Sequence, residues 1–408
     1  MISVEKALKT ILVNFRPLGL EKINILDVCG RVIGEDIFAS RNIPSAANSA
    51  MDGYAVSFAD VKNAPRALKI IEDIPAGKIA RKKINKGEAA RIMTGAVIPQ
   101  GADTVIRQED AQKDGKTVMI LIRAQKGDHI RYAGEDVRKG ERVIKKGDVL
   151  RPAHIGMLAA LGKASVRVYQ KPRVAIMSTG DELVDIKTIP GPGKIVNSNS
   201  YSLAAQVLES GATPIMLAIA RDKKSDLQKK FKTALNADVI ISSGGVSVGD
   251  FDFVKNVMGE IGNAMRFWQV AMRPGKPLAF GAIEGVPLFG LPGNPVSTMV
   301  SFEQFVRPSL LKMLGHKKIF RQTISATCTD GFEKKAGFRH FIRAVVRREN
   351  GQYVATTTGD QGSGILKSMV AANGLIVMGE NETHIEKGST VTVQLLDDSL
   401  SWSESLQL

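Results

Sequence analysis

An alternation of strand-like and helix-like segments between Lys171 and Gly315 constrains the fold more than any other feature of the sequence. Short apolar runs bounded by polar turns predict strands, and apolar residues at helical spacing predict the helices between them. Strands and helices at this spacing favour a parallel, doubly wound sheet, in which ligands gather at the carboxyl ends of the strands. We expect strands at 173–178, 214–219 and 237–242 and helices at 199–210, 224–235 and 252–261.

The turn after the third expected strand, Ser242–Asp252, is rich in glycine and leads into an expected helix. Its glycines can bring backbone N–H groups against a phosphate at the positive end of that helix, and a plain tight turn is an equal alternative. Four carboxylates also follow strand ends. Acids beside a phosphate repel it unless a hard cation lies between them, so this pattern favours Mg²⁺ shared with a phosphate over solvated loop acids. The four are Glu182, Asp222, Asp250 and Asp252.

Two proline-stiffened turns, Met272–Pro277 and Gly290–Thr298, come next. In the second turn, Asn294 has the N-cap position and Pro295 the first helical position, and the apolar run to Leu314 supplies the helix. The helix N-terminus and the two cations of the first turn favour an oxyanion between them; the alternative is that prolines and glycines only shape the turns. The cations are Arg273 and Lys276, and the helix adds the hydroxyls of Ser297 and Thr298.

The remaining sequence predicts three further parts. Apolar residues from Val4 to Phe15 at helical spacing predict an N-terminal helix. Short strands from Arg41 to about Glu135 predict a β-rich module inserted into a longer element, which resumes with a short helix at 153–161. Strands after Leu314 predict a small barrel or sandwich. We expect four domains: 1–40 together with 137–170, 41–136, 171–316, and 317–408.

The net charge of +15 comes from basic residues dispersed along the chain, with only 5% aromatic residues. Nucleic-acid-binding proteins usually concentrate their charge, so solvated lysines, or a field that attracts a small anionic substrate, fit better. Neither Cys29 nor Cys328 has metal-binding spacing, and no histidine has a partner at ligand spacing. No run of 18 apolar residues occurs. We expect a soluble protein of the reducing cytoplasm, without a membrane or nucleic-acid partner.

Motifs of glycine, proline and polar residues follow one another along essentially the whole chain: NSAMDGYA at 48–55, MTGA at 93–96, GED at 134–136, STGDEL at 178–183, SSGGVSVG at 242–249, RPGKP at 273–277, GLPGNP at 290–295 and TTTGDQGS at 356–363. Together they resemble the signature turns of the molybdopterin molybdenumtransferases, the bacterial MoeA family, which is similar to the E domain of gephyrin. The resemblance implies an α/β multidomain fold with a central doubly wound MogA-like domain, an inserted β-rich domain, an elongated linking domain and a C-terminal β-barrel.

The resemblance also implies an enzyme that inserts molybdate into adenylylated molybdopterin, with Mg²⁺-dependent release of AMP. It implies a homodimer, in which Asp52 and Thr94 come from the other subunit, and contact with the molybdopterin adenylyltransferase. By matching positions, it implies catalytic roles for Asp52, Thr94, Asp136 and Glu182 and Mg²⁺ ligation by Asp222 and Asp252. The implied substrate contacts are Ser243, Gly244, Gly245, Ser247, Arg273, Lys276, Pro277, Pro292, Asn294, Pro295, Ser297, Arg343 and Ser363.

Some alternatives stay open on the sequence. A carrier or scaffold would bind molybdopterin without turnover, and a related enzyme could handle tungstate. The chain departs from the family pattern at Ala46 and Ala47, which replace an aromatic residue and an acid, and at Gln269, which replaces a lysine of bacterial relatives. The assignment of Arg343 also competes with Arg339, four positions earlier on the same expected strand.

Overall fold

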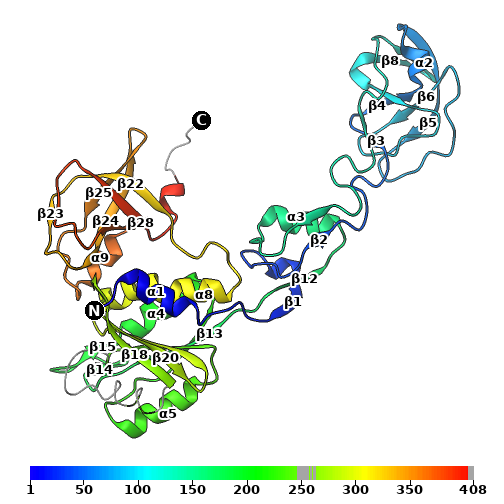
Figure 1. Ribbon diagram of the computed structural model, residues 1–408. Coiled ribbons are helices and arrows are strands. Elements are labelled where there is room, and N and C mark those ends of the chain that lie inside the picture. Colours follow the sequence, from blue (N-terminus) through cyan, green and yellow to red (C-terminus); the bar gives the residue numbers. More distant parts are fainter. Residues whose placement is uncertain (246–256, 258–259, 261–262, 403–408) are drawn as a thin grey trace. The chain divides into compact units, whose positions relative to one another are not determined.

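The computed structural model describes residues 1–245, 257, 260 and 263–402 (Figure 1). The chain forms two compact units, one of Met1–Glu21 with Arg167–Leu408 and the other of Lys22–Val166, and each is described by itself. The expected helix at 252–261 lies outside the described residues apart from isolated positions. The finer division into four domains stays a prediction.

A six-stranded sheet forms the centre of the first unit, and it is mixed rather than wholly parallel. Its first four strands are parallel, whereas the last two run antiparallel to their neighbours. The reversal comes from a two-residue turn at Glu284 and Gly285, which both have positive φ, the requirement of a tight hairpin. In spatial order the strands are β16 (Thr213–Met216), β13 (Arg173–Ser178), β17 (Val239–Ser243), β21 (Val286–Leu291), β20 (Pro277–Ile283) and β18 (Asn263–Gln269).

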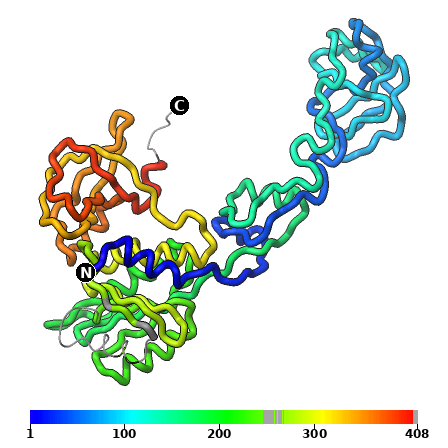
Figure 2. Tube along the Cα trace, in the orientation of Figure 1, coloured from blue at the N-terminus to red at the C-terminus, as the bar shows by residue number. Residues whose placement is uncertain are grey.

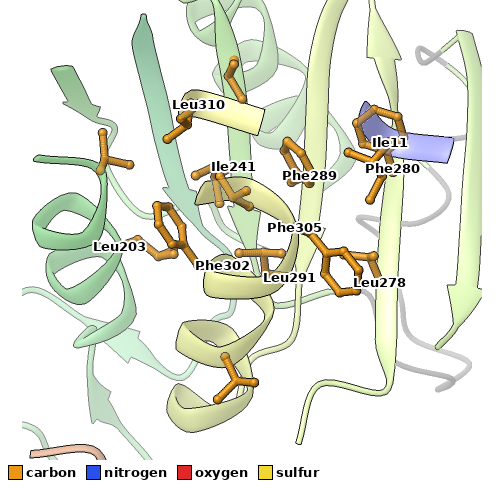
Figure 3. Packing of buried hydrophobic residues seen from close by; sticks show 14 of the residues in the cluster. Ile11, Leu203, Ile241, Leu278, Phe280, Phe289, Leu291, Phe302, Phe305 and Leu310 are labelled. Carbon is orange, nitrogen blue, oxygen red and sulfur yellow. The ribbon is translucent and has the colours of Figure 1, made fainter. Parts of the chain in front are cut away.

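Helices cover both faces of this sheet because alternate strand residues point to opposite sides. Ile241 belongs to the larger buried cluster, which includes Phe289 and Leu203 (Figure 3), whereas its neighbour Ile240 packs with Phe231 on the other face. The helices of the larger cluster are α1 (Val4–Leu12), α4 (Asn199–Glu209), α7 (Pro295–Ser301), α8 (Arg307–Met313) and α9 (Leu366–Ala371). The π-helical turn η3 (Phe302–Val306) joins α7 to α8, and α5 (Lys224–Ala234) covers the opposite face.

The N-terminal helix α1 packs into the central domain, far along the chain from its own position. Figure 2 shows this blue segment beside the yellow helix α8. The ammonium of Lys312 donates to the carbonyl of Leu12 at 2.8 Å, and the Phe15 ring lies 5.8 Å from that of Phe289. The helix ends at Leu12, before the expected Phe15, yet Phe15 is still buried.

The C-terminal strands form a closed barrel, which decides between the barrel and the sandwich left open by the sequence. β24 (Arg339–Glu349) pairs with both β25 and β26, so the five strands close on themselves. The short strand β19 (Met272–Arg273) of the central domain extends β24 in parallel. The other barrel strands are β22 (Thr323–Cys328), β25 (Gln352–Thr357), β26 (Gly374–Met378) and β28 (Thr390–Leu395).

The second unit contains a six-stranded sheet and the paired ends of the segment into which it is inserted. β2 (Ile37–Phe38) pairs with β11 (Arg142–Ile144), and α3 (Pro152–Ala160) follows them in the chain. The β-rich stretch therefore interrupts one continuous element, as its composition predicts. The sheet strands in spatial order are β7 (Thr104–Arg107), β4 (Gly53–Val56), β6 (Glu88–Ile92), β5 (Arg66–Ile74), β9 (Thr117–Ile120) and β8 (Ala111–Asp114).

Within the described part of the chain, no helix combines the length and apolar character needed to cross a bilayer.

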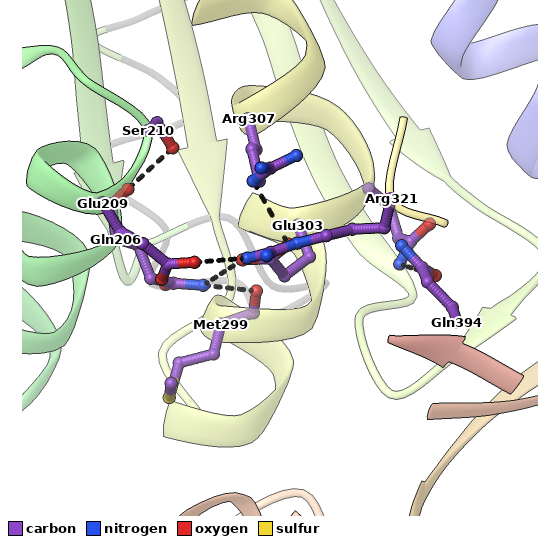
Figure 4. Close-up of polar contacts among 9 residues, drawn as sticks. Gln206, Glu209, Ser210, Met299, Glu303, Arg307, Arg321 and Gln394 are labelled. Carbon is purple, nitrogen blue, oxygen red and sulfur yellow. Dashed lines mark hydrogen bonds and ion pairs between the residues drawn. The ribbon is translucent and has the colours of Figure 1, made fainter. Parts of the chain in front are cut away.

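A buried polar network lies beside the π-helical turn (Figure 4). The carboxylate of Glu303 accepts from Arg321 at 3.0 Å and from the amide of Gln206 at 3.2 Å. Arg321 also donates to Glu209 at 2.7 Å. Because Arg321 lies on the segment that leads into the barrel, this network ties that segment to the central domain.

We predict that Arg321→Ala destabilises the first unit by about 3 kcal/mol, because the buried carboxylate of Glu303 loses its nearest ion-pair partner. The loss stays near the lower end of the range for buried ion pairs, since Arg307 remains 3.9 Å from Glu303. Glu209→Ala is the matched control: its side chain is 53% exposed, so losing the same Arg321 contact should cost about 1 kcal/mol or less. Urea unfolding followed by Trp268 fluorescence measures both, and equal costs would contradict the burial argument.

Candidate functional site

The carboxyl ends of β13, β17 and β21 surround a cavity of about 620 Å³, which we call the strand-end cavity. Its walls come from the turns that follow these strands and from the N-termini of α4 and α7. Of the expected site residues, it is lined by Glu182, Asp222, Ser243, Gly244, Gly245, Pro277, Pro292, Asn294, Pro295 and Ser297.

Gly244 lies in this wall with φ +92°, and a Cβ there would lie 2.9 Å from the carbonyl oxygen of Thr179. Glycine is therefore required by both backbone conformation and space. Its N–H donates to the carbonyl of Leu291 at 3.1 Å. The expectation that Gly244 offers a bare N–H to a phosphate is therefore wrong, since that N–H already bridges two strand ends.

Asn199, which sequence reasoning missed, organises the same wall. Its side-chain amide donates to the hydroxyl of Ser243 at 2.9 Å and to the carbonyl of Gly293 at 2.8 Å. The carbonyl oxygen of this side chain is buried and has no hydrogen-bond partner among the described residues. The only signal in the sequence was its place at the start of the expected helix at 199–210.

Acidic side chains gather at one side of the strand-end cavity. The carboxylates of Asp181 and Asp222 each accept from the other's backbone N–H, at 3.4 and 3.3 Å. Burial raises the pKa of Asp222, and the charges of Asp181 and Glu182 raise it further. Among the described residues no three acids, histidines or cysteines are placed to hold a metal together. The expected contributions of Ser247, Asp250 and Asp252 lie outside the described residues.

A second cavity of about 440 Å³, which we call the cationic cavity, lies between the central domain and the barrel within the first unit. Pro277, Asn294 and Ser297 line both cavities, so the two adjoin along a shared wall. The cationic cavity is also lined by Arg273, Lys276, His340, Arg343, Gln361 and Ser363.

Arg343 is the most unusual group in the cationic cavity, because its side chain is 1% exposed and no carboxylate of the described residues pairs with it. It donates to the hydroxyl of Ser368 and to the carbonyl of Gly362, both at 3.0 Å. Burial lowers the pKa of this guanidinium. The charge of Asp360 opposes this effect without forming an ion pair with Arg343. A buried charge without a directly bonded counterion is costly, so the position favours a bound anion.

Arg339 differs from Arg343 in its partners. It forms ion pairs with Glu5 and Glu380 and does not line the cationic cavity. Of the two arginines, the geometry places Arg343 in the cavity wall, and its role in substrate binding stays a prediction.

The other two cations of this cavity also lack acidic partners among the described residues. The guanidinium of Arg273 lies 4.6 Å from the ring centroid of Phe338, and the ammonium of Lys276 lies 5.9 Å from it. Such cation–π contacts hold a cation in place while leaving its charge uncompensated. The cavity is thus built to attract an anion.

The helix N-terminus beside these cations is partly occupied. Asn294 has the N-cap position and Pro295 is the first helical residue, as the sequence predicts. The side chain of Asn294 does not cap the helix but donates to the hydroxyl of Ser363 at 2.9 Å, and the N–H of Val296 donates to the carbonyl of Ser363 at 3.1 Å. The helix end therefore holds the barrel loop against the cavity.

The second unit contains the remaining expected residues. The carboxylate of Asp52 accepts from the N–H and the hydroxyl of Thr94, at 2.7 and 2.8 Å, and these bonds lower its pKa. Asp136 donates its backbone N–H to the carbonyl of Ile43 and has no bond to either residue. The structure thus brings Asp52 and Thr94 into direct contact, which the sequence did not predict, and the catalytic roles of Asp52, Thr94 and Asp136 stay predictions.

Comparison with known proteins matches every region of the chain. Family models match as the "MoeA N-terminal region (domain I and II)" over residues 2–162, the "Probable molybdopterin binding domain" over 175–312 and the "MoeA C-terminal region (domain IV)" over 325–396. A molybdopterin molybdenumtransferase of Haemophilus influenzae is 37% identical over 383 residues, which is 93% of this chain and 94% of that protein. The chain belongs to the MoeA family.

Other relatives agree with this assignment. A molybdopterin molybdenumtransferase of Bacillus subtilis is 37% identical and covers 97% of this chain and 94% of its own length. The crystal structure of a molybdopterin biosynthesis MoeA protein from Pyrococcus horikoshii covers 97% of this chain and all of its own at 31% identity, with a TM-score of 0.82. The expected family, enzyme class and multidomain fold with a MogA-like α/β domain are confirmed.

The departures from the MoeA pattern fall in both units, Gln269 in the first and Ala46 with Ala47 in the second. Gln269 ends β18, opposite Pro277, and lines neither cavity. Ala47 accepts from the N–H of Ile98 through its backbone, so its side chain is not needed for that contact. Gln269 therefore adjoins the cavity wall through its strand partner Pro277, which lines both cavities.

We predict that Asp222→Asn raises the thermal stability of the metal-free protein at pH 7. The pKa of Asp222 is higher in the folded than in the unfolded state, so ionising this carboxyl group lowers the free energy of unfolding at neutral pH. This loss of stability disappears as the pH falls toward 3.8, where the group is protonated in both states. Thermal unfolding in chelator between pH 3.5 and 8 measures the difference, with the exposed Asp114→Asn as control. A wild type that is more stable than Asp222→Asn at every pH would contradict this explanation.

Proposed function

We propose that this chain inserts molybdenum from molybdate into adenylylated molybdopterin, releasing AMP and giving molybdenum cofactor. The observation that supports this most strongly is Arg343, a buried cation with no carboxylate partner among the described residues, in a cavity that contains two more. Relatives named molybdopterin molybdenumtransferase support the nature of the transferred group.

Molybdate, as a substrate, would bind in the cationic cavity. Arg273, Lys276 and Arg343 supply three positive charges, and the hydroxyls of Ser297 and Ser363 supply neutral polar contacts. Charged donors fixed in a partly dehydrated cavity attract an oxyanion far more strongly than they would in water. The contacts of Arg273 and Lys276 with Phe338 keep these donors in position before the anion arrives.

Adenylylated molybdopterin would bind in the adjoining strand-end cavity, which is the larger of the two. The shared wall of Pro277, Asn294 and Ser297 would bring the two substrates side by side. When both reactants are held on one rigid wall, a bimolecular step becomes effectively unimolecular. This effect can supply a large part of the rate enhancement of such an enzyme.

The acids of the strand-end cavity fit Mg²⁺. Magnesium usually takes one or two carboxylates and completes its shell with water and phosphate oxygens, so a three-acid site is not needed. Asp222 is the best-supported ligand, since its raised pKa marks a carboxylate crowded by Asp181 and Glu182 that a cation would stabilise. Asp252 stays the proposed second ligand. Bound there, Mg²⁺ would neutralise part of the diphosphate charge.

The second unit would complete the active site in a homodimer. The hydrogen bonds from Thr94 keep the carboxylate of Asp52 ionised and oriented, which suits a group that positions a nucleophile. We propose that this pair, together with Asp136 of the same unit, serves the site of the other subunit. The proposal includes contact with the molybdopterin adenylyltransferase and a cytoplasmic location.

A matched pair of arginine variants tests the molybdate assignment. Arg343→Met should weaken molybdate binding on the order of 100-fold, because charged hydrogen bonds are lost, while the melting temperature stays near that of wild type. Arg339→Met should lower the melting temperature, because it breaks the ion pairs with Glu5 and Glu380. It should leave molybdate binding near that of wild type, because Arg339 does not line the cavity. Titration calorimetry and thermal unfolding measure the two effects, and equal loss of binding in both variants would refute the assignment.

Reconstitution tests the reaction. Purified protein with adenylylated molybdopterin, molybdate and Mg²⁺ should release AMP and form active cofactor, and both products should require molybdate and Mg²⁺. Tight binding of an intact adenylylated molybdopterin would instead indicate a carrier or scaffold. Parallel reactions with tungstate distinguish the tungstate-handling alternative.

A further inference from the structure

His340 lies in the wall of the cationic cavity, and no step above uses it. It is the second residue of β24, and in the parallel pairing of β19 with β24 it lies directly opposite Arg273. Paired residues of neighbouring strands place their side chains on the same face of a sheet. The imidazole therefore projects on the same side as one of the three unpaired cations.

The surroundings of His340 leave its polar edge unused. Its ring meets the ring of Phe332 edge-on, with centroids 6.1 Å apart. Among the described residues no group forms a hydrogen bond with either ring nitrogen, although the side chain is half-buried. A partly dehydrated imidazole with free donor and acceptor capacity indicates a ligand on the cavity side.

His340 is neutral at physiological pH. Burial, together with the charges of Lys334 and Arg273, lowers the pKa of His340 from 6.5 to about 4. Lys334 follows β23 (Phe332–Glu333), and Arg273 belongs to β19, so positive charge approaches the ring from two elements. A neutral imidazole has one N–H donor and one acceptor nitrogen.

We propose that His340 donates a hydrogen bond to the oxyanion held by Arg273, Lys276 and Arg343, and is thus a further molybdate-binding residue of this chain. The inference rests on the proposed function and extends it. The three cations supply most of the attraction, and a neutral N–H adds one more directional hydrogen bond to an oxygen of the tetrahedral anion without adding a fourth charge.

Molybdate titration of the full chain tests this role with three variants. His340→Ala should weaken molybdate binding roughly tenfold, the effect of one lost hydrogen bond to an anion. His340→Gln, whose amide N–H has a similar reach, should recover most of that loss. Lys276→Ala should weaken molybdate binding more than His340→Ala does, because it removes a full charge. Thermal unfolding of each variant without molybdate reports whether the fold is intact.

The outcomes separate the inference from the proposed function on which it rests. Loss in His340→Ala with recovery in His340→Gln supports the donor role. If Lys276→Ala weakens binding but His340→Ala does not, the inference falls and the cavity assignment stands. Equal losses in His340→Ala and His340→Gln with lowered melting temperatures would assign His340 to packing and overturn the inference. If neither Lys276→Ala nor His340→Ala changes binding, both the inference and the cavity assignment are overturned.

Discussion

A buried guanidinium without a carboxylate is the constraint on which the rest of the structure depends. Arg343 is held by the neutral groups of Ser368 and Gly362, and the charge of Asp360 opposes only part of its burial cost, so an anion that enters the cavity would stabilise it. Buried charges are tolerated in proteins where function needs them, and they require a rigid frame. Two contacts of the helical segment from α7 to α8 supply that frame. Ser363 of the barrel loop contacts the start of α7, and Arg321 contacts Glu303 in the π-helical turn.

The two cavities carry opposite electrostatic demands across a shared wall. In the strand-end cavity, burial and the neighbouring charges of Asp181 and Glu182 raise the pKa of Asp222, which favours a bound cation. Unpaired cations line the other cavity, which favours a bound anion. The proposed reaction, between a diphosphate-linked substrate with Mg²⁺ and a metal oxyanion, would need both environments within reach of each other. The wall of Pro277, Asn294 and Ser297 provides that proximity.

Local patterns predicted much of the fold, whereas long-range pairing decided what they missed. Helix starts such as Asn294–Pro295 follow from the chemistry of adjacent residues, and the structure contains them. The hairpin at Glu284–Gly285 was not predicted, because its two strands have no helix between them and so fall outside the strand–helix alternation on which the prediction rested. The side-chain partner of Asn294 and the ion pairs of Arg339 link segments distant in sequence, so no local pattern reveals them. The candidate site was predicted mainly through motifs, and Asn199 and His340 lie outside those motifs.

The most direct test of the central claim is the location of molybdate in a crystal. A crystal of the full chain soaked in molybdate, with anomalous diffraction recorded at the molybdenum absorption edge, gives that location independently of any activity. The account predicts one strong peak in the cationic cavity, within hydrogen-bonding distance of Arg343 and next to Arg273 and Lys276. Saturating molybdate that leaves this cavity empty, or that binds only elsewhere, would contradict it.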